Sequence, residues 1–196
     1  MIWVLMAVVV VLLVVIGLLL ARERRSRQLK ADFGPEYERV VADKGDQRAA
    51  ERELAERRQR QQKFELRPLP PEVRDEYARR WQATQRHFVD KPIAAVGEAD
   101  ALVRDAMRDR GYPVDDDFEQ RAADISVEHP VVVENYRAGV DISSRATRGE
   151  ASTEDLRQAM VHFRALFADL LASSDQPSRA ERDFDADVPR QTARSG

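Results

Sequence analysis

A stretch of acidic and histidine residues between positions 110 and 130, RGYPVDDDFEQRAADISVEHP, is the first place in this chain to look for chemistry. It holds three consecutive aspartates, Asp115 to Asp117, and ends near His129. Carboxylates and imidazoles bind divalent cations and act as general acids and bases. A calcium-binding EF-hand loop, however, needs alternating oxygen ligands and a glycine at its sixth position, and both are missing here. We therefore interpret the stretch as structural, with acids placed to begin a short helix.

The three histidines lack the neighbours that a metal or catalytic site needs. A di-iron bundle uses Glu-x-x-His pairs, whereas the residues three positions before His87, His129 and His162 are a threonine, a serine and an alanine. The chain has no cysteine, which excludes disulfides, thiolate nucleophiles and zinc ribbons. Its glycines are scattered singly, so no phosphate-binding loop is present. We expect no catalytic residue, no metal and no cofactor; whether the protein is an enzyme is left open, with a non-enzymatic role favoured.

An aromatic stripe is the alternative to that view. Between Val73 and Phe88 the apolar side chains recur at helical spacings of three and four residues, and they include Tyr77 and Trp81. We interpret this face as part of a hydrophobic core. The alternative is a pocket for a small ligand or substrate formed by Tyr77, Trp81, His87 and Phe88.

The amino-terminal segment from Ile2 to Leu20 carries no charge. A helix rises 1.5 Å per residue, so this segment nearly matches a hydrocarbon core of about 30 Å. It predicts a transmembrane anchor over residues 1–21. The rival interpretation, a cleaved signal peptide, is disfavoured because no basic residue precedes the segment and no small-x-small cleavage site follows it.

A basic juxtamembrane segment, residues 22–32, follows the anchor. Under the positive-inside rule it predicts a single-pass protein with its amino terminus outside and the rest of the chain in the cytoplasm. A secreted or extracytoplasmic domain is the alternative. Two interpretations of these side chains are open: they fix topology alone, or they also contact anionic lipid headgroups, in which case the bilayer is itself a partner. They are Arg22, Arg24, Arg25, Arg27 and Lys30.

Residues 33–65 predict a polar helical spacer. Pro35 suits the first turn of a helix, and Gly45 followed by Asp46 predicts the end of one helix and the start of the next. The run 47–63 is rich in helix formers but has Leu54 as its one large apolar side chain, so it is a solvated spacer or an edge helix against a partner. The linker 66–71 has the PxxP pattern of an SH3 ligand, although its prolines also suit a plain linker.

Residues 66–171 predict an antiparallel helical bundle, because amphipathic faces recur through them and no segment alternates as a strand does. Residues 172–196 lose this periodicity and predict a disordered tail. The fold class is therefore all-α, with an anchor before the bundle. The expected apolar faces are Val73–Phe88, Ile93–Met107, Phe118–Ile125, Val131–Ile142 begun by Pro130, and Leu156–Leu170 capped by Ser152.

Three segments have a familiar sequence: FGPEY at 33–37, RGYPV at 110–114 with FEQRAAD at 118–124, and GEASTEDLRQAM at 149–160. They resemble an uncharacterised family of bacterial proteins with a hydrophobic amino terminus, labelled hypothetical, membrane or secreted proteins. The resemblance covers about residues 31–171. It implies no activity, and the label "secreted" would place the folded part on the opposite side of the membrane from the one that the basic segment predicts.

These patterns favour a membrane-tethered scaffold or adaptor whose helical bundle binds a protein partner. The net charge of −3 gives no reason to expect a nucleic acid partner. A ligand-binding or enzymatic domain around Trp81 is the second hypothesis, and a membrane-surface sensor that acts through the juxtamembrane arginines is the third. The oligomeric state and the identity of the partner are left open by the sequence.

Overall fold

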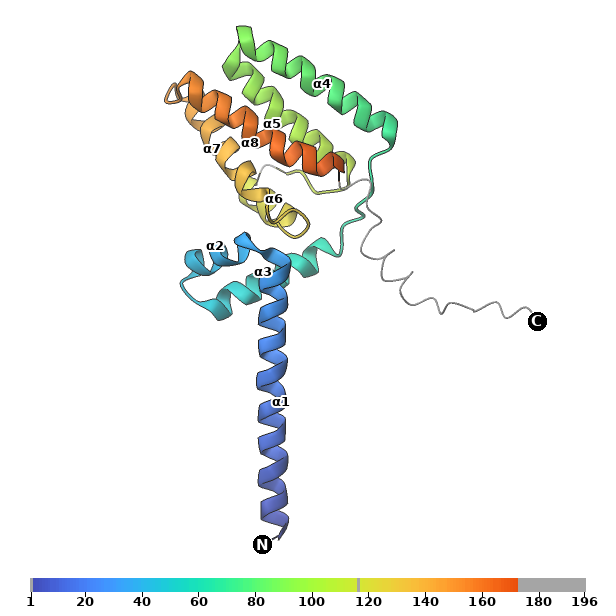
Figure 1. Cartoon of the computed structure of the whole chain (residues 1–196), viewed down its shortest axis with the longest axis vertical. Helices are drawn as coiled ribbons and strands as arrows, with labels where there is room; N and C mark the ends of the chain where they lie inside the picture. The colour runs from blue at the N-terminus through green and yellow to red at the C-terminus, as the bar shows by residue number, and fades with distance from the viewer. Residues whose placement is uncertain (1, 116, 173–196) are drawn as a thin grey trace, which may run out of the picture. The chain divides into compact units, whose positions relative to one another are not determined.

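The computed structural model describes residues 2–115 and 117–172, apart from the side chains of residues 2, 4, 5, 7–11, 18 and 19. Helices are the regular elements in this part of the chain, and no strand is found in it, which confirms the all-α prediction (Figure 1). The helices are α1 (Ile2–Phe33), α2 (Pro35–Lys44), α3 (Gln47–Gln61), α4 (Pro71–Asp90), α5 (Pro92–Asp109), α6 (Phe118–Ile125), α7 (Val133–Thr147) and α8 (Thr153–Ala172).

The chain forms two compact units. The first contains residues 1–65 and 112–138, and the second contains residues 66–111 and 139–196, as far as these are described. This grouping differs from the predicted domains, in which residues 66–171 made one bundle. The segment around α6 belongs with the amino-terminal part, and helix α7 begins in the first unit and ends in the second.

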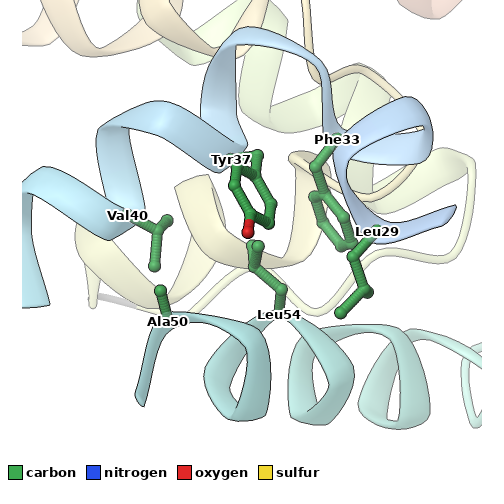
Figure 2. Close-up of a cluster of buried hydrophobic side chains, with 6 residues drawn as sticks. All are labelled: Leu29, Phe33, Tyr37, Val40, Ala50 and Leu54. Carbon is green, nitrogen blue, oxygen red and sulfur yellow. The ribbon is translucent and has the colours of Figure 1, made fainter. Parts of the chain in front are cut away.

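The core of the first unit joins the end of α1 to α2 and α3. Although α3 is strongly polar, its Ala50 and Leu54 are fully buried, so this helix is built into a compact unit and does not stand alone in solvent as a spacer would. Val41 and Val127 pack against the same core. Figure 2 shows the six side chains that form it: Leu29, Phe33, Tyr37, Val40, Ala50 and Leu54.

Local sequence rules explain how these three helices are separated. Helix α1 stops at Phe33 because Gly34 follows with φ of 46°, a left-handed conformation that glycine adopts readily. Pro35 is the first residue of α2, as predicted. Gly45 ends α2 with φ of 64°, and the Asp46 side chain then caps α3. The predicted break between the two helices is therefore confirmed.

The Asp46 cap supports a first prediction. Its carboxylate accepts hydrogen bonds from the backbone N–H groups of Arg48 and Ala49, so Asp46→Ala should lower the free energy of unfolding by about 1 kcal/mol. Urea unfolding of the detergent-solubilised chain, followed by circular dichroism, measures this. The exposed Asp43 is the control, and Asp43→Ala should stay within about 0.5 kcal/mol of the wild type. Equal losses in the two variants would contradict a capping role.

Helices α4 and α5 of the second unit form an antiparallel pair, and α8 packs on α5 (Figure 1). The Arg110 guanidinium, just after α5, donates to the Leu170 carbonyl near the end of α8, at 3.0 Å. The carboxyl ends of α5 and α8 therefore lie together and these two helices run in the same direction, so the predicted antiparallel order holds for α4 and α5 but not for α5 and α8. The cross-links between α4 and α5 include Tyr77–Asp109, Arg80–Asp105 and His87–Glu98, at 2.7, 2.8 and 2.7 Å.

The predicted burial of two apolar side chains, Ile93 and Val131, is wrong. Ile93 was expected to face inward, but it is 53% exposed in the first turn of α5. The helix expected to begin at Pro130 begins at Val133, because the His129 carbonyl accepts the N–H groups of Val132 and Val133 in a turn that precedes it. Val131 in that turn is 70% exposed, whereas Val133 is fully buried. A proline thus precedes this helix by three residues.

The acidic stretch has a structural role in the described residues. Gly111 takes φ of 95° after α5, and Asp117 caps α6 by accepting the N–H of Gln120. The Tyr112 hydroxyl donates to the Glu128 carboxylate at 2.7 Å, which closes the two ends of the stretch on one another. The predicted cap is therefore present, formed by Asp117. Asp116 lies outside the described residues.

Two predictions concern the ends of the chain. A membrane crossing needs a long and continuously apolar helix, and none is found among the residues that the structure describes. The anchor predicted over residues 1–21 includes many side chains outside that description, and it stays a prediction. The tail predicted over 172–196 lies, after Ala172, outside the described residues as well.

Candidate functional site

A polar groove of about 400 Å³ lies between α1 and α3 in the first unit. Its volume falls within the range of sites for small ligands, which is roughly 300–1,000 Å³. Two side chains of α1, three of α3 and one directly after α3 give it its chemistry, and all six are hydrogen-bond donors. They are Arg25 and Gln28 from α1, Arg52, Arg58 and Gln59 from α3, and Gln62, which caps the end of α3.

Helical periodicity places these side chains on facing stripes. On α1, Arg25 and Gln28 are three residues apart and share one face. Arg52 and Gln59 of α3 and the capping Gln62, whose backbone is still helical, recur at seven and three residues, close to whole turns of the helix. The buried side of α3 carries Ala50, Leu54 and Arg57 instead. Packing of that side on the core therefore directs the arginine and glutamine stripe into the groove.

The groove has an excess of positive charge. Arg58 is neutralised by an ion pair with Asp32 and lies over the Phe33 ring at 5.8 Å. Glu56 supplies a negative charge at the groove itself. Arg25 and Arg52 are exposed and form no ion pair within the described part of the chain. Their two guanidinium groups are therefore available to an anion.

The five predicted basic residues have different environments. Arg27 pairs with Glu23 at 2.6 Å on the exposed surface of α1. Lys30 pairs with Glu38 at 2.5 Å, and this contact raises the pKa of the lysine. Arg22 and Arg24 are exposed, and Arg25 lines the groove. Sequence reasoning identified the basic segment but missed Arg52 and the glutamines opposite it. The repeat of those side chains along α3 was the available signal.

The predicted aromatic pocket is largely occupied by the protein itself. Trp81 stacks on Phe167 of α8 with ring centroids 4.9 Å apart and planes at 22°, and Tyr77 meets the same ring edge-on at 5.9 Å. Burial, together with the hydrogen bond to Asp109, raises the pKa of Tyr77. These two residues are brought together, but as core. His87 instead contacts Glu98 of α5, and Phe88 is half-buried.

A buried ion cluster, which we call the Glu36 cluster, holds the first unit together. The Glu36 side chain is 1% exposed and receives hydrogen bonds from three guanidinium groups. Arg39 binds it through two bonds of 2.9 Å, Arg57 through one of 2.8 Å and Arg137 through one of 3.2 Å. Arg57 also lies 3.4 Å from the Ser126 hydroxyl. The cluster therefore joins α2, α3 and α7 beside α6.

Two opposing effects, burial and the charges of neighbouring side chains, set the pKa values of the residues in this cluster. Burial alone would raise the pKa of Glu36, but the hydrogen bonds and charges of Arg39, Arg137 and Arg57 outweigh it and lower the pKa. Burial also lowers the pKa of Arg137, against the opposing effect of Glu36. A carboxylate that is ionised and surrounded by arginines in this way has a structural use, because each partner satisfies a charge that would otherwise be costly to bury.

Acid should weaken this cluster. Because the pKa of Glu36 is lower in the folded chain than its usual 4.5, its contribution to stability is complete above about pH 5 and is lost as the pH falls through the folded value. The wild type should lose stability as the pH falls below about 5. The Glu36→Gln variant should be less stable at pH 7 and lose less on acidification, as measured by urea unfolding across this range. Parallel pH profiles for the two proteins would contradict the assignment.

No group of three His, Asp or Glu side chains that could hold a metal ion is found in the described residues. The buried His129 lies beside Tyr112, with ring centroids 6.4 Å apart, and belongs to the packing of the first unit.

No protein-family model, no curated protein and no solved structure matches this chain. The family resemblance therefore stays a prediction, and functional inference rests on the geometry of the groove and of helix α1.

Proposed function

We propose that the protein is a single-pass membrane protein that acts as an adaptor, with its helical units held at the bilayer surface. The observation that carries this proposal is the difference between the two ends of α1, one buried in a protein core and the other apolar and exposed. The helix runs without a break from Ile2 to Phe33, and its carboxyl end is buried in the core of the first unit through Leu29 and Phe33. Large apolar side chains along its other end are 43–78% exposed: Trp3, Met6, Leu12, Leu13, Val14, Val15, Ile16 and Leu20.

Exposed apolar side chains at this density need an apolar surrounding, and a lipid bilayer provides one. Under the positive-inside rule, the basic residues that follow Leu20 support a cytoplasmic position for the folded units. Because α1 enters the core of the first unit directly, that unit is held close to the bilayer without a flexible linker. Such an arrangement suits a protein that concentrates a partner at the membrane.

An exposed apolar pair on the second unit supports a protein partner. Val89, at the end of α4, is 83% exposed, and Ile93, at the start of α5, is 53% exposed. The two residues flank the short connection between these helices. Aliphatic pairs of this kind gain free energy when a partner removes them from water.

Two experiments test the proposal. Alkaline carbonate should leave the full chain in the membrane pellet, and its release into the supernatant would overturn the anchor. Affinity capture from detergent-solubilised membranes should recover a partner in near-stoichiometric amount, and the V89D/I93D variant should lose it. Val161→Asp is the matched control, because Val161 is 50% exposed on α8 of the same unit. Equal recovery with the double variant and the control would contradict docking at this pair.

A further inference from the structure

We propose that the α1–α3 groove binds the phosphate of an anionic lipid headgroup. This inference rests on the proposed membrane anchor and goes beyond it by giving the first unit a specific lipid ligand. It also gives Arg25 a larger contribution to lipid binding than the other basic residues of the juxtamembrane segment. A general electrostatic attraction to the bilayer would instead give all of these residues similar contributions.

The donors of the groove suit a phosphate. Arg25 on α1 and Arg52 on α3 supply guanidinium groups from opposite walls, and each can donate two parallel hydrogen bonds to phosphate oxygens. The amides of Gln28 and Gln59 add neutral donors on the same two walls. Neither guanidinium is held in an ion pair in the described part of the chain, so binding need not break one.

The shape of the groove leaves room for a headgroup. The small side chain of Ala55 lies along the α3 wall, and the buried Leu29 closes the α1 side. A volume of about 400 Å³ can hold a phosphate with an attached polyol. Glu56 at the groove is suited to accept a hydrogen bond from such a polyol hydroxyl, which favours a phosphodiester with a hydroxylated headgroup over a bare phosphate.

The position of the groove along α1 matches the headgroup layer. Arg25 is four residues beyond Ala21, the end of the predicted anchor, which places it about 6 Å farther along the helix axis. The headgroup region extends about 5–8 Å beyond the hydrocarbon on each side of a bilayer. The lipid phosphates and Arg25 are therefore expected at the same depth. A lipid needs no displacement from the bilayer to reach Arg25.

Native mass spectrometry of the full chain in an uncharged detergent tests the proposal, with phosphatidylglycerol as the probe and phosphatidylcholine as the comparison lipid. The R25Q/R52Q variant removes both guanidinium groups of the groove. The R24Q/R48Q variant is the matched control, because it removes one exposed arginine from each of the same two helices and changes the net charge equally. Glycerol phosphate, titrated separately, tests a soluble source of the same chemistry.

The wild type should bind phosphatidylglycerol more tightly than phosphatidylcholine. The R25Q/R52Q variant should bind phosphatidylglycerol roughly 30-fold more weakly, and the R24Q/R48Q variant should change less than about threefold. Equal weakening in both variants would assign binding to diffuse charge and overturn the site. Binding that is unchanged in R25Q/R52Q would overturn it as well. Glycerol phosphate that binds as tightly as the lipid, and is lost in R25Q/R52Q, would overturn the lipid source and leave the groove as a soluble phosphate site.

Failure of the anchor can be distinguished from failure of the groove. Carbonate extraction of the R25Q/R52Q variant should leave it in the membrane pellet, because the apolar segment is intact. Release of the wild type by carbonate would refute the anchor whatever the groove binds. Retention of the wild type together with equal lipid binding by all variants would refute the groove alone.

Discussion

Replacing Glu36 with alanine is expected to lower the free energy of unfolding by about 3–5 kcal/mol, one of the two largest effects expected of a single substitution in this protein. The side chain is 1% exposed and holds Arg57 and Arg137, whose side chains are 7% and 13% exposed. Without the carboxylate, the buried Arg137 loses the charge that compensates it, and Arg57 keeps its ion pair with Glu53 of the same helix. Hydrogen–deuterium exchange of the detergent-solubilised chain should show faster exchange in α2 and α3.

Glu38 provides the control for this prediction. It lies two residues away in the same helix and pairs with Lys30, but both side chains are more than half exposed. A surface pair of this kind contributes about 0–1 kcal/mol, so Glu38→Ala should leave exchange in α3 nearly unchanged. If Glu36→Ala and Glu38→Ala had the same small effect, the Glu36 cluster would not be a stabilising element of the first unit.

Phe167→Ala is expected to have a comparable effect on the second unit. Its ring stacks on Trp81 and meets the edge of Tyr77, so its removal leaves a cavity among α4, α5 and α8 and should cost about 3–5 kcal/mol. The chain has two tryptophans, and a Trp3→Phe background leaves Trp81 as the single tryptophan, which can be excited selectively at wavelengths that tyrosine does not absorb. Urea unfolding followed by Trp81 emission then reports on the second unit.

Val161→Ala is the control on the same helix, because Val161 is 50% exposed. It should shift the unfolding midpoint little, within about 0.5 kcal/mol. A red-shifted Trp81 emission in native Phe167→Ala would agree with an opened core. Emission and stability identical to those of the wild type would show that Phe167 does not cover Trp81, and would restore the aromatic pocket as a ligand site.

Local chemistry made much of the fold predictable. Pro35, Gly45 and Asp46 each act within a few residues of the backbone they constrain, so the helix ends that they set were readable from sequence. The face of α8 was readable for a related reason. Leu156, Phe163 and their neighbours are large, apolar and spaced by helical turns, so one side of the helix had to be buried.

Burial of charge was not predictable in the same way. Arg57 counts as polar in any hydropathy pattern, yet it is buried because Glu36, 21 residues away, neutralises it together with Glu53 of the same helix. Arg137 completes the cluster from 101 residues away. A pattern along one helix contains no information about partners at that separation, so α3 gave the pattern of a solvated spacer. Only the packing of α2, α3 and α7 shows why its charges can leave water.

The residues of the groove were also predictable only where local sequence was sufficient. Arg25 was identified because a run of basic residues after an apolar segment has a known meaning at a membrane. Arg52 was missed because its relevance comes from facing Arg25 across the groove, which needs the pairing of α1 with α3. The exposed Ile93 was misassigned because periodicity gives one apolar stripe but cannot tell where the neighbouring helices stop covering it.

Cysteine accessibility in intact cells tests the central claim, the membrane anchor and its orientation, most directly. The chain has no cysteine of its own, so single-cysteine variants report on one position each. A membrane-impermeant maleimide should label Trp3→Cys in intact cells. It should label Arg48→Cys, an exposed position of α3, only after permeabilisation. Labelling of Arg48→Cys in intact cells would contradict the proposed anchoring and topology.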